Sequence, residues 1–301
     1  MYIGRFAPSP TGPLHMGSLV SALASYLDAR SQDGQWHLRI EDVDTPRTVA
    51  GAADAMIQTL THLGFHWDGP VVYQSQRDAP YAKAFQDLKD KQLVYPCACT
   101  RKEIADSQPT HLTSNEFSTD GAPVYPGTCR HGLASDKTAR AWRMRVDEAE
   151  IYFDDHGMGP QHEALSISCG DFVLRRADGL WAYQLAVVVD DAALGVTHVV
   201  RGADLLASTA RQIYLQQCLG YSTPHYWHVP LVLAEDGEKL SKQNGATALE
   251  LRDPVALLNQ ALRHFEIAPC PVDSLAAWWP LATARWAAYR QITHSKFARK
   301  D

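Results

Sequence analysis

The sequence lacks any long hydrophobic run. Its 301 residues contain no uninterrupted apolar stretch of about 18 residues, which is the length that a membrane-spanning helix needs. The first residues also lack a basic segment followed by an apolar one, so we expect no signal peptide. These absences predict a protein that does not associate with a membrane.

Positive charge is outnumbered by negative charge, and the cysteines are not needed as disulfides. The 28 Lys and Arg residues stand against 34 Asp and Glu, for a net charge of −6, which does not favour a general nucleic-acid binder, although a local basic groove can occur on an acidic protein. The chain has six cysteines and is long enough to form a core without disulfides. We therefore expect a reduced, cytoplasmic protein whose cysteines are available for a metal.

The arrangement of apolar residues is typical of an α/β protein. The chain length suggests about two domains. The order of strand, loop, helix, strand and helix near the start favours a parallel sheet. The first part is expected to contain strands over 2–7 and 36–40 and helices over 17–29 and 51–63. After about residue 168 the pattern resumes, with strands over 196–201 and 226–233, a helix over 204–219, and tail helices over 253–265 and 274–289.

The region between about 70 and 165 differs from its surroundings. A helix is expected over 81–91 and a strand over 141–146, but the polar stretch 106–120 has no clear periodicity. This region is interpreted as an insertion between two halves of a nucleotide-binding fold. The predicted domains are residues 1–75 with 166–245 (the catalytic domain in two halves), 76–165 (the inserted subdomain) and 246–301 (a helical C-terminal region).

Two short polar motifs could bind phosphate. His15-Met16-Gly17-Ser18 opens the first expected helix, where unpaired N–H groups carry partial positive charge and His15 could donate to a phosphate oxygen. Lys239-Leu240-Ser241-Lys242 lies in a polar loop, and two lysines around a serine suit the β- and γ-phosphates of ATP. Each motif alone has a simpler interpretation, a Gly/Pro turn for the first and a solvated charged turn for the second.

Together, the two motifs resemble the HIGH and KMSKS motifs of class I aminoacyl-tRNA synthetases. The segment Arg5-Phe6-Ala7-Pro8-Ser9-Pro10-Thr11-Gly12 is similar to the glutamyl/glutaminyl branch, and the resemblance continues through 39–44 and 199–204 over about residues 1–250. It implies a class I Rossmann-like parallel sheet and the use of ATP with Mg²⁺. It also implies that ATP is bound by His15, Gly17, Ser18, Lys239, Ser241 and Lys242, of which His15, Lys239 and Lys242 are catalytic.

A glutamate substrate needs a carboxylate for its ammonium group and cationic partners for its carboxylates. Arg5 and Ser9 lie near the expected ATP site, and Glu41 ends the second expected strand at the same edge. The resemblance implies that Glu41 faces the amino group and that the pocket comprises Arg5, Phe6, Ala7, Pro8, Ser9, Glu41, Tyr183 and Arg201. An arginine partner would favour glutamate over neutral glutamine. The alternative for Glu41 and Arg201 is a structural salt bridge, and Asp42, Asp44 and Arg47 are interpreted as loop structure.

Three cysteines in the insertion have spacing that suits a metal. Cys97, Cys99 and Cys129 would supply three thiolates to a tetrahedral zinc, although Cys-x-Cys is tighter than the usual spacing. The fourth ligand is left open by the pattern. The resemblance to full-length glutamyl-tRNA synthetases implies His131, whereas shorter paralogues imply Tyr125, which we favour. One structural zinc per chain is expected, and the alternative is a set of metal-free thiols.

Only residues 244–301 follow the second motif, and we expect no anticodon-binding domain. In this respect, and in having Ser18 where HIGH has its second histidine, the chain resembles the glutamyl-queuosine tRNA(Asp) synthetases, truncated paralogues of glutamyl-tRNA synthetase. This resemblance implies activation of L-glutamate without tRNA, its transfer to queuosine at the wobble position, binding of the tRNA(Asp) anticodon stem-loop, and a monomer.

Other functions remain open. They are a minimal glutamyl-tRNA synthetase that charges the 3′ end of tRNA(Glu), a non-catalytic paralogue that binds tRNA or glutamate, and a general adenylyltransferase. Candidate contacts to the anticodon stem are Arg101, Lys102 and Arg211, although the preferred interpretation of each is a solvated surface charge.

Overall fold

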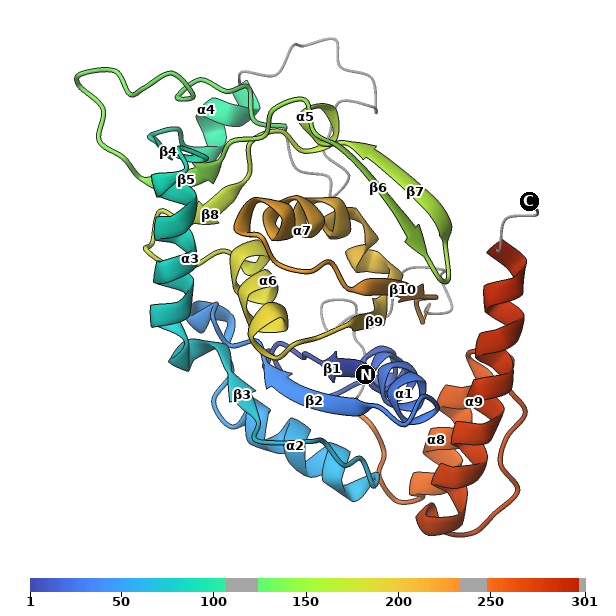
Figure 1. Cartoon of the computed structure of the whole chain (residues 1–301). Coiled ribbons are helices and arrows are strands. Elements are labelled where there is room, and N and C mark those ends of the chain that lie inside the picture. The colour runs from blue at the N-terminus through green and yellow to red at the C-terminus, as the bar shows by residue number, and fades with distance from the viewer. Residues whose placement is uncertain (107–123, 233–247, 298–301) are drawn as a thin grey trace.

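A parallel sheet begins the fold. A computed structural model describes residues 1–106, 124–232 and 248–297. In it β1 (Ile3–Phe6), β2 (Gln35–Ile40) and β3 (Val72–Tyr73) pair in parallel in that order. Parallel neighbours need a crossover, and α1 (Met16–Arg30) and α2 (Ala52–His62) provide the two crossovers (Figure 1).

A second sheet continues the first. Its order is β7 (Gly159–Ala164), β6 (Glu150–Asp155), β10 (His225–Val229) and β9 (His198–Gly202). The backbone N–H of Thr197, just before β9, donates to the carbonyl of Ile3 at 2.9 Å, so β9 lies beside β1 (Figure 1). The order across the molecule is therefore β3-β2-β1-β9-β10-β6-β7.

The sheet is buried on both faces. Successive strand residues point to opposite faces, and Val199 and Tyr226 belong to one core cluster while Val200 and Trp227 belong to the other. The first cluster includes side chains of α3 (Asp78–Asp90), α6 (Tyr183–Ala193) and α7 (Leu206–Leu219, preceded by the 3₁₀ turn Ala203–Leu205), and the second includes side chains of α1, α2, α8 (Pro254–Arg263) and α9 (Leu275–Phe297). Because helices cover both faces of the sheet, the position of the edge at which the strands end is held from both sides.

A separate small sheet forms mostly from the region predicted as an insertion over 76–165, with one of its strands beyond residue 165. Strands β4 (Val94–Cys97), β5 (Ala141–Met144) and β8 (Val173–Arg175) pair antiparallel, with α4 (Arg101–Asp106) and α5 (Leu165–Ser168) nearby in the chain. The β6–β7 hairpin pairs with β10 through Asp155 and Tyr226. The hairpin therefore joins the insertion predicted over 76–165 to the larger sheet.

The C-terminal helices pack against the first half of the chain. Asp253 caps α8 by accepting from the N–H of Ala256 at 2.9 Å. Asp28 of α1 accepts hydrogen bonds from the Tyr2 hydroxyl at 2.5 Å, Trp286 Nε1 at 3.1 Å and Arg290 Nε at 2.9 Å. Within the described ranges, no helix combines the length and apolar character that crossing a membrane would require.

Most of the predicted elements are confirmed, within a few residues at their ends. The strand predicted to reach residue 233 ends at Val229, where Pro230 has no N–H to continue a ladder. Helix α6 was not predicted, because its residues from Leu185 to Val189 are all apolar and show no helical period. The β6–β7 hairpin and β4 were also not predicted.

Candidate active site and metal centre

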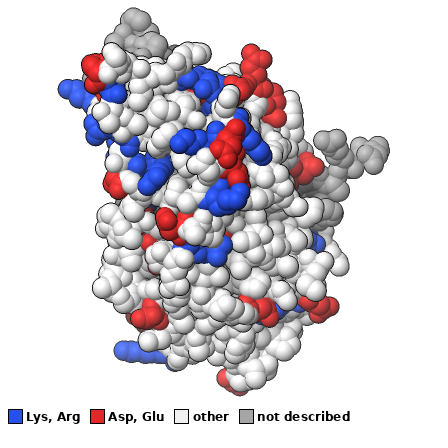
Figure 2. All heavy atoms as spheres, turned by 60° about the vertical axis from the view of Figure 1, so that its left-hand side comes forward, with Lys and Arg blue, Asp and Glu red and all other residues white. Residues whose placement is uncertain are grey.

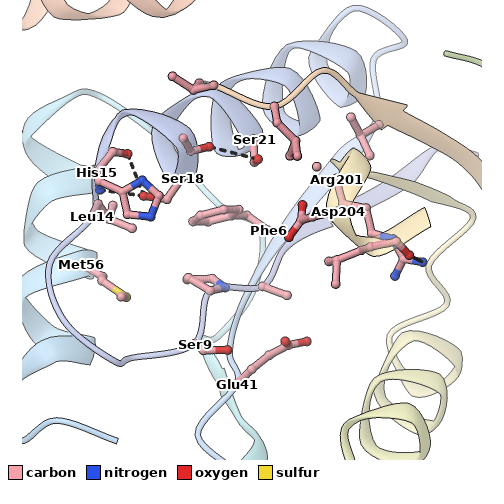
Figure 3. A pocket seen from close by; sticks show the side chains of 18 of the residues that line it. Phe6, Ser9, Leu14, His15, Ser18, Ser21, Glu41, Met56, Arg201 and Asp204 are labelled. Atoms are coloured by element: carbon pink, nitrogen blue, oxygen red, sulfur yellow. Dashed lines mark hydrogen bonds between the residues drawn. The ribbon is translucent and has the colours of Figure 1, made fainter. Parts of the chain in front are cut away.

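A cavity of about 410 Å³ opens where the strands end (Figure 3). Its volume is in the range of small-molecule sites, and the carboxyl edge of a parallel sheet is where such sites form. Eleven residues predicted from the sequence line it: Arg5, Phe6, Ala7, Pro8, Ser9, His15, Gly17, Ser18, Glu41, Tyr183 and Arg201. Figure 3 shows His15 and Ser18 on one side of the cavity and Arg201 and Asp204 on the other. Lys239, Ser241 and Lys242 lie outside the described residues.

Four buried charges form a network beside the cavity. Asp191 of α6 accepts from Arg5 Nε at 3.2 Å and from Arg39 Nη1 at 2.5 Å, and Arg39 Nη2 donates to Glu41 Oε1 at 3.0 Å. Two guanidinium groups therefore balance two carboxylates, which matters because an unpaired buried charge is strongly unfavourable.

The network shifts the acid strengths of its members. Burial raises the pKa of Glu41, and the positive charge of Arg39 opposes that rise. Burial also opposes the ionisation of Asp191, but Arg39 and Arg5 outweigh it and hold its pKa below the usual value. Burial, followed by the charge of Glu41, raises the pKa of the Tyr183 hydroxyl.

The network leaves polar atoms available to a ligand. Among the described residues, the hydrogen bonds of Arg5 use only Nε, and those of Glu41 use only Oε1. The Nη atoms of Arg5 and Oε2 of Glu41 thus have no hydrogen bond from that part of the chain. A cationic edge and a carboxylate oxygen therefore border the same cavity.

Arg201, by contrast, is held by the protein at all three nitrogens. Its Nε donates to His228 Nε2 at 3.0 Å, Nη1 donates to Gln212 Oε1 at 2.8 Å, and Nη2 donates to Thr209 Oγ1 at 2.9 Å. The residue is only 5% exposed. Its guanidinium is consequently fixed in orientation at the cavity wall.

The start of α1 forms the opposite wall. The Ser18 hydroxyl accepts from the His15 N–H at 2.8 Å and donates to the His15 carbonyl at 2.7 Å (Figure 3). Ser18 therefore completes the first turn of the helix. The other N–H groups of this turn give the cavity the partial positive charge of a helix N-terminus.

The charged loop after β2 has a structural arrangement. Asp42 accepts from the N–H and hydroxyl of Ser75 at 2.8 and 2.7 Å. Asp44 pairs with Arg47 at 2.6 Å and with Arg176 at 2.9 Å. Both carboxylates thus hold the loop in place, Asp42 through Ser75 beyond the loop and Asp44 through Arg47 within it and Arg176 beyond it.

Three thiols meet in the insertion. The Sγ atoms of Cys97, Cys99 and Cys129 lie within 4.8 Å of one another, and those of Cys99 and Cys129 are 3.6 Å apart. A tetrahedral zinc with Zn–S distances of about 2.3 Å would place its sulfurs about 3.8 Å apart. The thiols therefore fit a metal centre without a large rearrangement.

A fourth donor lies at the same point. The Tyr125 hydroxyl is 3.4 Å from Cys97 Sγ and 3.6 Å from Cys99 Sγ, and its oxygen accepts from the Cys129 N–H at 2.9 Å. His131 is exposed. Burial raises the pKa of the Tyr125 phenol, while the Arg143 guanidinium, which lies 3.8 Å from the centre of the Tyr125 ring, donates to Cys97 Sγ at 3.3 Å. The geometry favours Tyr125 over His131.

The candidate anticodon contacts differ in exposure. Arg101 and Lys102 are exposed on α4, but Arg211 is buried and donates to the Ala207 carbonyl at 3.3 Å. The interpretation of Arg211 as a solvated surface charge is therefore wrong, because its side chain folds back along α7. Figure 2 shows Lys and Arg interspersed with Asp and Glu on the face that carries α3.

Two residues of the site had weak or no sequence signals. Asp191 follows an apolar run as the second of two adjacent carboxylates, a pattern that indicates buried charge but does not name its partners. His228 lies within an expected strand and carries no motif. Neither was predicted to belong to the site.

Comparison with known proteins gives the family of the chain. Residues 3–263 match the family model described as tRNA synthetases class I (E and Q), catalytic domain. A glutamyl-Q tRNA(Asp) synthetase of Janthinobacterium sp. (strain Marseille) is 58% identical over 291 residues, covering 95% of this chain and 97% of that protein. A protein of the same name from Dechloromonas aromatica (strain RCB) is 60% identical over 262 residues, covering 87% and 85%.

Solved structures share the fold. The glutamate-tRNA synthetase of Elizabethkingia anophelis superposes with a TM-score of 0.68 at 29% identity, covering 81% of this chain and 53%, about half, of that chain. A glutamate tRNA ligase of Elizabethkingia meningosepticum CCUG26117 gives a TM-score of 0.76 at 23% identity, covering 98% of this chain and 69% of that chain.

Proposed function

Since this chain belongs to the class I tRNA synthetases for glutamate and glutamine, and is thus a ligase, we propose that it activates L-glutamate with ATP and transfers it to queuosine of tRNA(Asp). The observation that carries the glutamate step is the cavity, where Arg5, Glu41 and Arg201 surround one space beside the α1 N-terminus. The acceptor is proposed from the names of the close relatives.

Glutamate binding follows from the charges. Oε2 of Glu41 is suited to accept from the substrate ammonium, because Oε1 is already occupied by Arg39. The Nη atoms of Arg5 and the fixed guanidinium of Arg201 supply charge-assisted hydrogen bonds for carboxylates. Glutamine would leave an arginine facing a neutral amide, so the site selects against it.

Adenylate formation uses the other side of the cavity. The glutamate α-carboxylate attacks the α-phosphorus of ATP and pyrophosphate leaves. His15 and the N-terminus of α1 are placed to stabilise phosphate charge. Lys239 and Lys242, assigned by resemblance, would neutralise the departing pyrophosphate, and Mg²⁺ bound to ATP would share that role.

Transfer completes the reaction. A hydroxyl of queuosine attacks the activated carboxyl carbon, an ester forms, and AMP leaves with the adenylate oxygen. We propose that the tRNA(Asp) anticodon stem-loop is cupped by the region that in full-length relatives takes the acceptor end. The zinc proposed at Cys97, Cys99, Tyr125 and Cys129 would be structural and would stabilise this inserted region.

Charging with labelled glutamate tests the proposal. Purified protein is incubated with ATP, [¹⁴C]glutamate and one of three RNAs: tRNA(Asp) with queuosine, tRNA(Asp) without queuosine, and tRNA(Glu). We expect label only in the first. Label in tRNA(Glu) alone would identify a minimal glutamyl-tRNA synthetase instead. ATP–pyrophosphate exchange without tRNA should occur only when glutamate is present. If the protein showed no such exchange, it would be a non-catalytic paralogue.

A further inference from the structure

His228 occupies the interior of the fold behind the cavity wall. Its ring, on β10, is fully buried between a carboxylate and a guanidinium. Nδ1 lies 2.5 Å from Oδ2 of Asp155, and Nε2 lies 3.0 Å from Nε of Arg201. Asp155 comes from β6, and Arg201 comes from β9. Asp155, His228 and Arg201 thus form a hydrogen-bonded chain that ends at the cavity.

The protonation of the imidazole follows from its partners. An arginine Nε in a protein always carries its proton, so His228 Nε2 can only accept. The neutral ring has one proton, which must then sit on Nδ1 and be donated to the Asp155 carboxylate. The hydroxyl of Thr209, 3.2 Å from Nε2, can donate to the same nitrogen. A single tautomer satisfies these bonds.

Asp155 is itself held rigidly. Its Oδ1 accepts from the backbone N–H groups of Gly157 and Met158, both at 2.9 Å, and from that of His228 at 3.1 Å. The carboxylate therefore closes the β6–β7 turn and fixes the ring of His228 at the same time. Fixing a tautomer through a buried carboxylate is a common way to aim a functional side chain.

We propose that His228, held by Asp155, is a positioning residue that aims the Arg201 guanidinium at a carboxylate of the substrate. The inference rests on the proposed function, which makes Arg201 part of the glutamate site. Arg201 can offer the substrate only the N–H bonds that the protein leaves unused. Its angle at the cavity wall therefore decides whether those bonds reach a carboxylate.

Three substitutions separate this role from a general structural one. His228→Gln can place an amide oxygen near the position of Nε2 and keep the acceptor for Arg201. His228→Asn can keep a donor near the position of Nδ1 for Asp155 but is too short to reach Arg201. His228→Leu keeps neither bond. KM values for glutamate and for ATP are measured separately by ATP–pyrophosphate exchange, with thermal unfolding of each variant.

We expect His228→Asn and His228→Leu to raise the KM for glutamate about 10- to 100-fold, as loss of a hydrogen bond to a charged group would, with the KM for ATP unchanged. His228→Gln should recover most of the glutamate affinity. The proposal is overturned if His228→Gln is as impaired as His228→Leu, or if the two KM values rise together in step with loss of thermal stability.

A second measurement needs no activity. Nitrogen-15 NMR of the labelled wild-type chain, with His228→Gln used to assign the ring, reports which nitrogen carries the proton. We expect it on Nδ1, and a proton on Nε2 would overturn the proposal. If the wild type shows no glutamate-dependent exchange, the proposed function fails, and this spectrum still decides whether His228 Nε2 can accept from Arg201.

Discussion

The carboxylate of Asp191 lies 3.2 Å from Nε of Arg5, and this pair joins β1 to the end of α6. The same carboxylate pairs with Arg39, which in turn holds Glu41. One aspartate outside every recognised motif therefore pairs with two buried arginines, one of which lines the cavity.

Replacing Asp191 with alanine should cost much stability. The substitution leaves Arg5 and Arg39 buried with one carboxylate between them, and removing one partner of a buried pair typically costs about 3–5 kcal/mol. The free energy of unfolding in urea measures the effect. Asp87→Ala, which removes the exposed partner of Lys83, is the matched control and should change little. Equal effects of the two substitutions would contradict the role assigned to Asp191.

Glutamate binding should weaken on acidification because of Glu41. Only the ionised carboxylate attracts the substrate ammonium, and burial raises the pKa of Glu41 above its usual 4.5. As the pH falls, glutamate binding should therefore be lost at a higher pH than it would be if Glu41 were an exposed glutamate with the usual pKa. Calorimetric titration with glutamate across this range measures the decline.

The variant Glu41→Gln is the control for this pH effect. It should bind glutamate weakly, keep ATP affinity, and retain only the pH dependence that the substrate's own carboxyl groups contribute. If glutamate and ATP affinity fall alike in Glu41→Gln, the residue does not face the substrate amino group.

The metal content should depend on Tyr125 and not on His131. Elemental analysis of purified protein should find about one zinc per chain. Cys129→Ser should lose it, because one of the three thiolates that would hold the metal is removed. Tyr125→Phe should reduce zinc retention against a chelator, whereas His131→Ala should retain zinc like the wild type. Release of the metal by His131→Ala, with retention by Tyr125→Phe, would reverse the ligand assignment.

Lys242→Ala should slow adenylate formation. A preorganised cation at the leaving phosphate is worth about 10²–10³ in rate, so ATP–pyrophosphate exchange should fall by that factor with an unchanged circular dichroism spectrum. Lys83→Ala on the exposed side of α3 is the control. An exchange rate equal to that of the wild type in Lys242→Ala would remove this lysine from the catalytic assignment.

The cavity could be predicted from the sequence because strand order determines where strand ends meet. Arg5 and Glu41 lie at or near the carboxyl ends of neighbouring parallel strands, so identifying those strands is enough to bring them together. Arg201, on β9, is predicted to belong to the pocket only through the family resemblance. The pairing of Arg5 with Asp191, by contrast, spans 186 residues. No local sequence pattern can indicate a pairing between residues so far apart in the chain.

The other features that the sequence did not predict also depend on contacts between residues far apart in the chain. His228 receives its role from Asp155, 73 residues earlier, and from Arg201 on the neighbouring strand. Tyr125 and His131 both fit the spacing of a fourth ligand, and only the path of the chain between the cysteines separates them. Sequence pattern thus identifies which residue types meet at an edge, whereas packing selects the side chains that hold them.

The contact between Asp28 and helix α9 has a consequence for biosynthesis. Asp28 leaves the ribosome well before its partners Trp286 and Arg290, which lie 258 and 262 residues further along the chain. Apolar side chains of α1 such as Leu23 and Leu27 share a core cluster with Trp286. At a synthesis rate of about 5–20 residues per second, they remain without this partner for roughly tens of seconds. During translation the nascent segment around α1 should therefore be a target for chaperones, and it should reach its final packing only after α9 emerges.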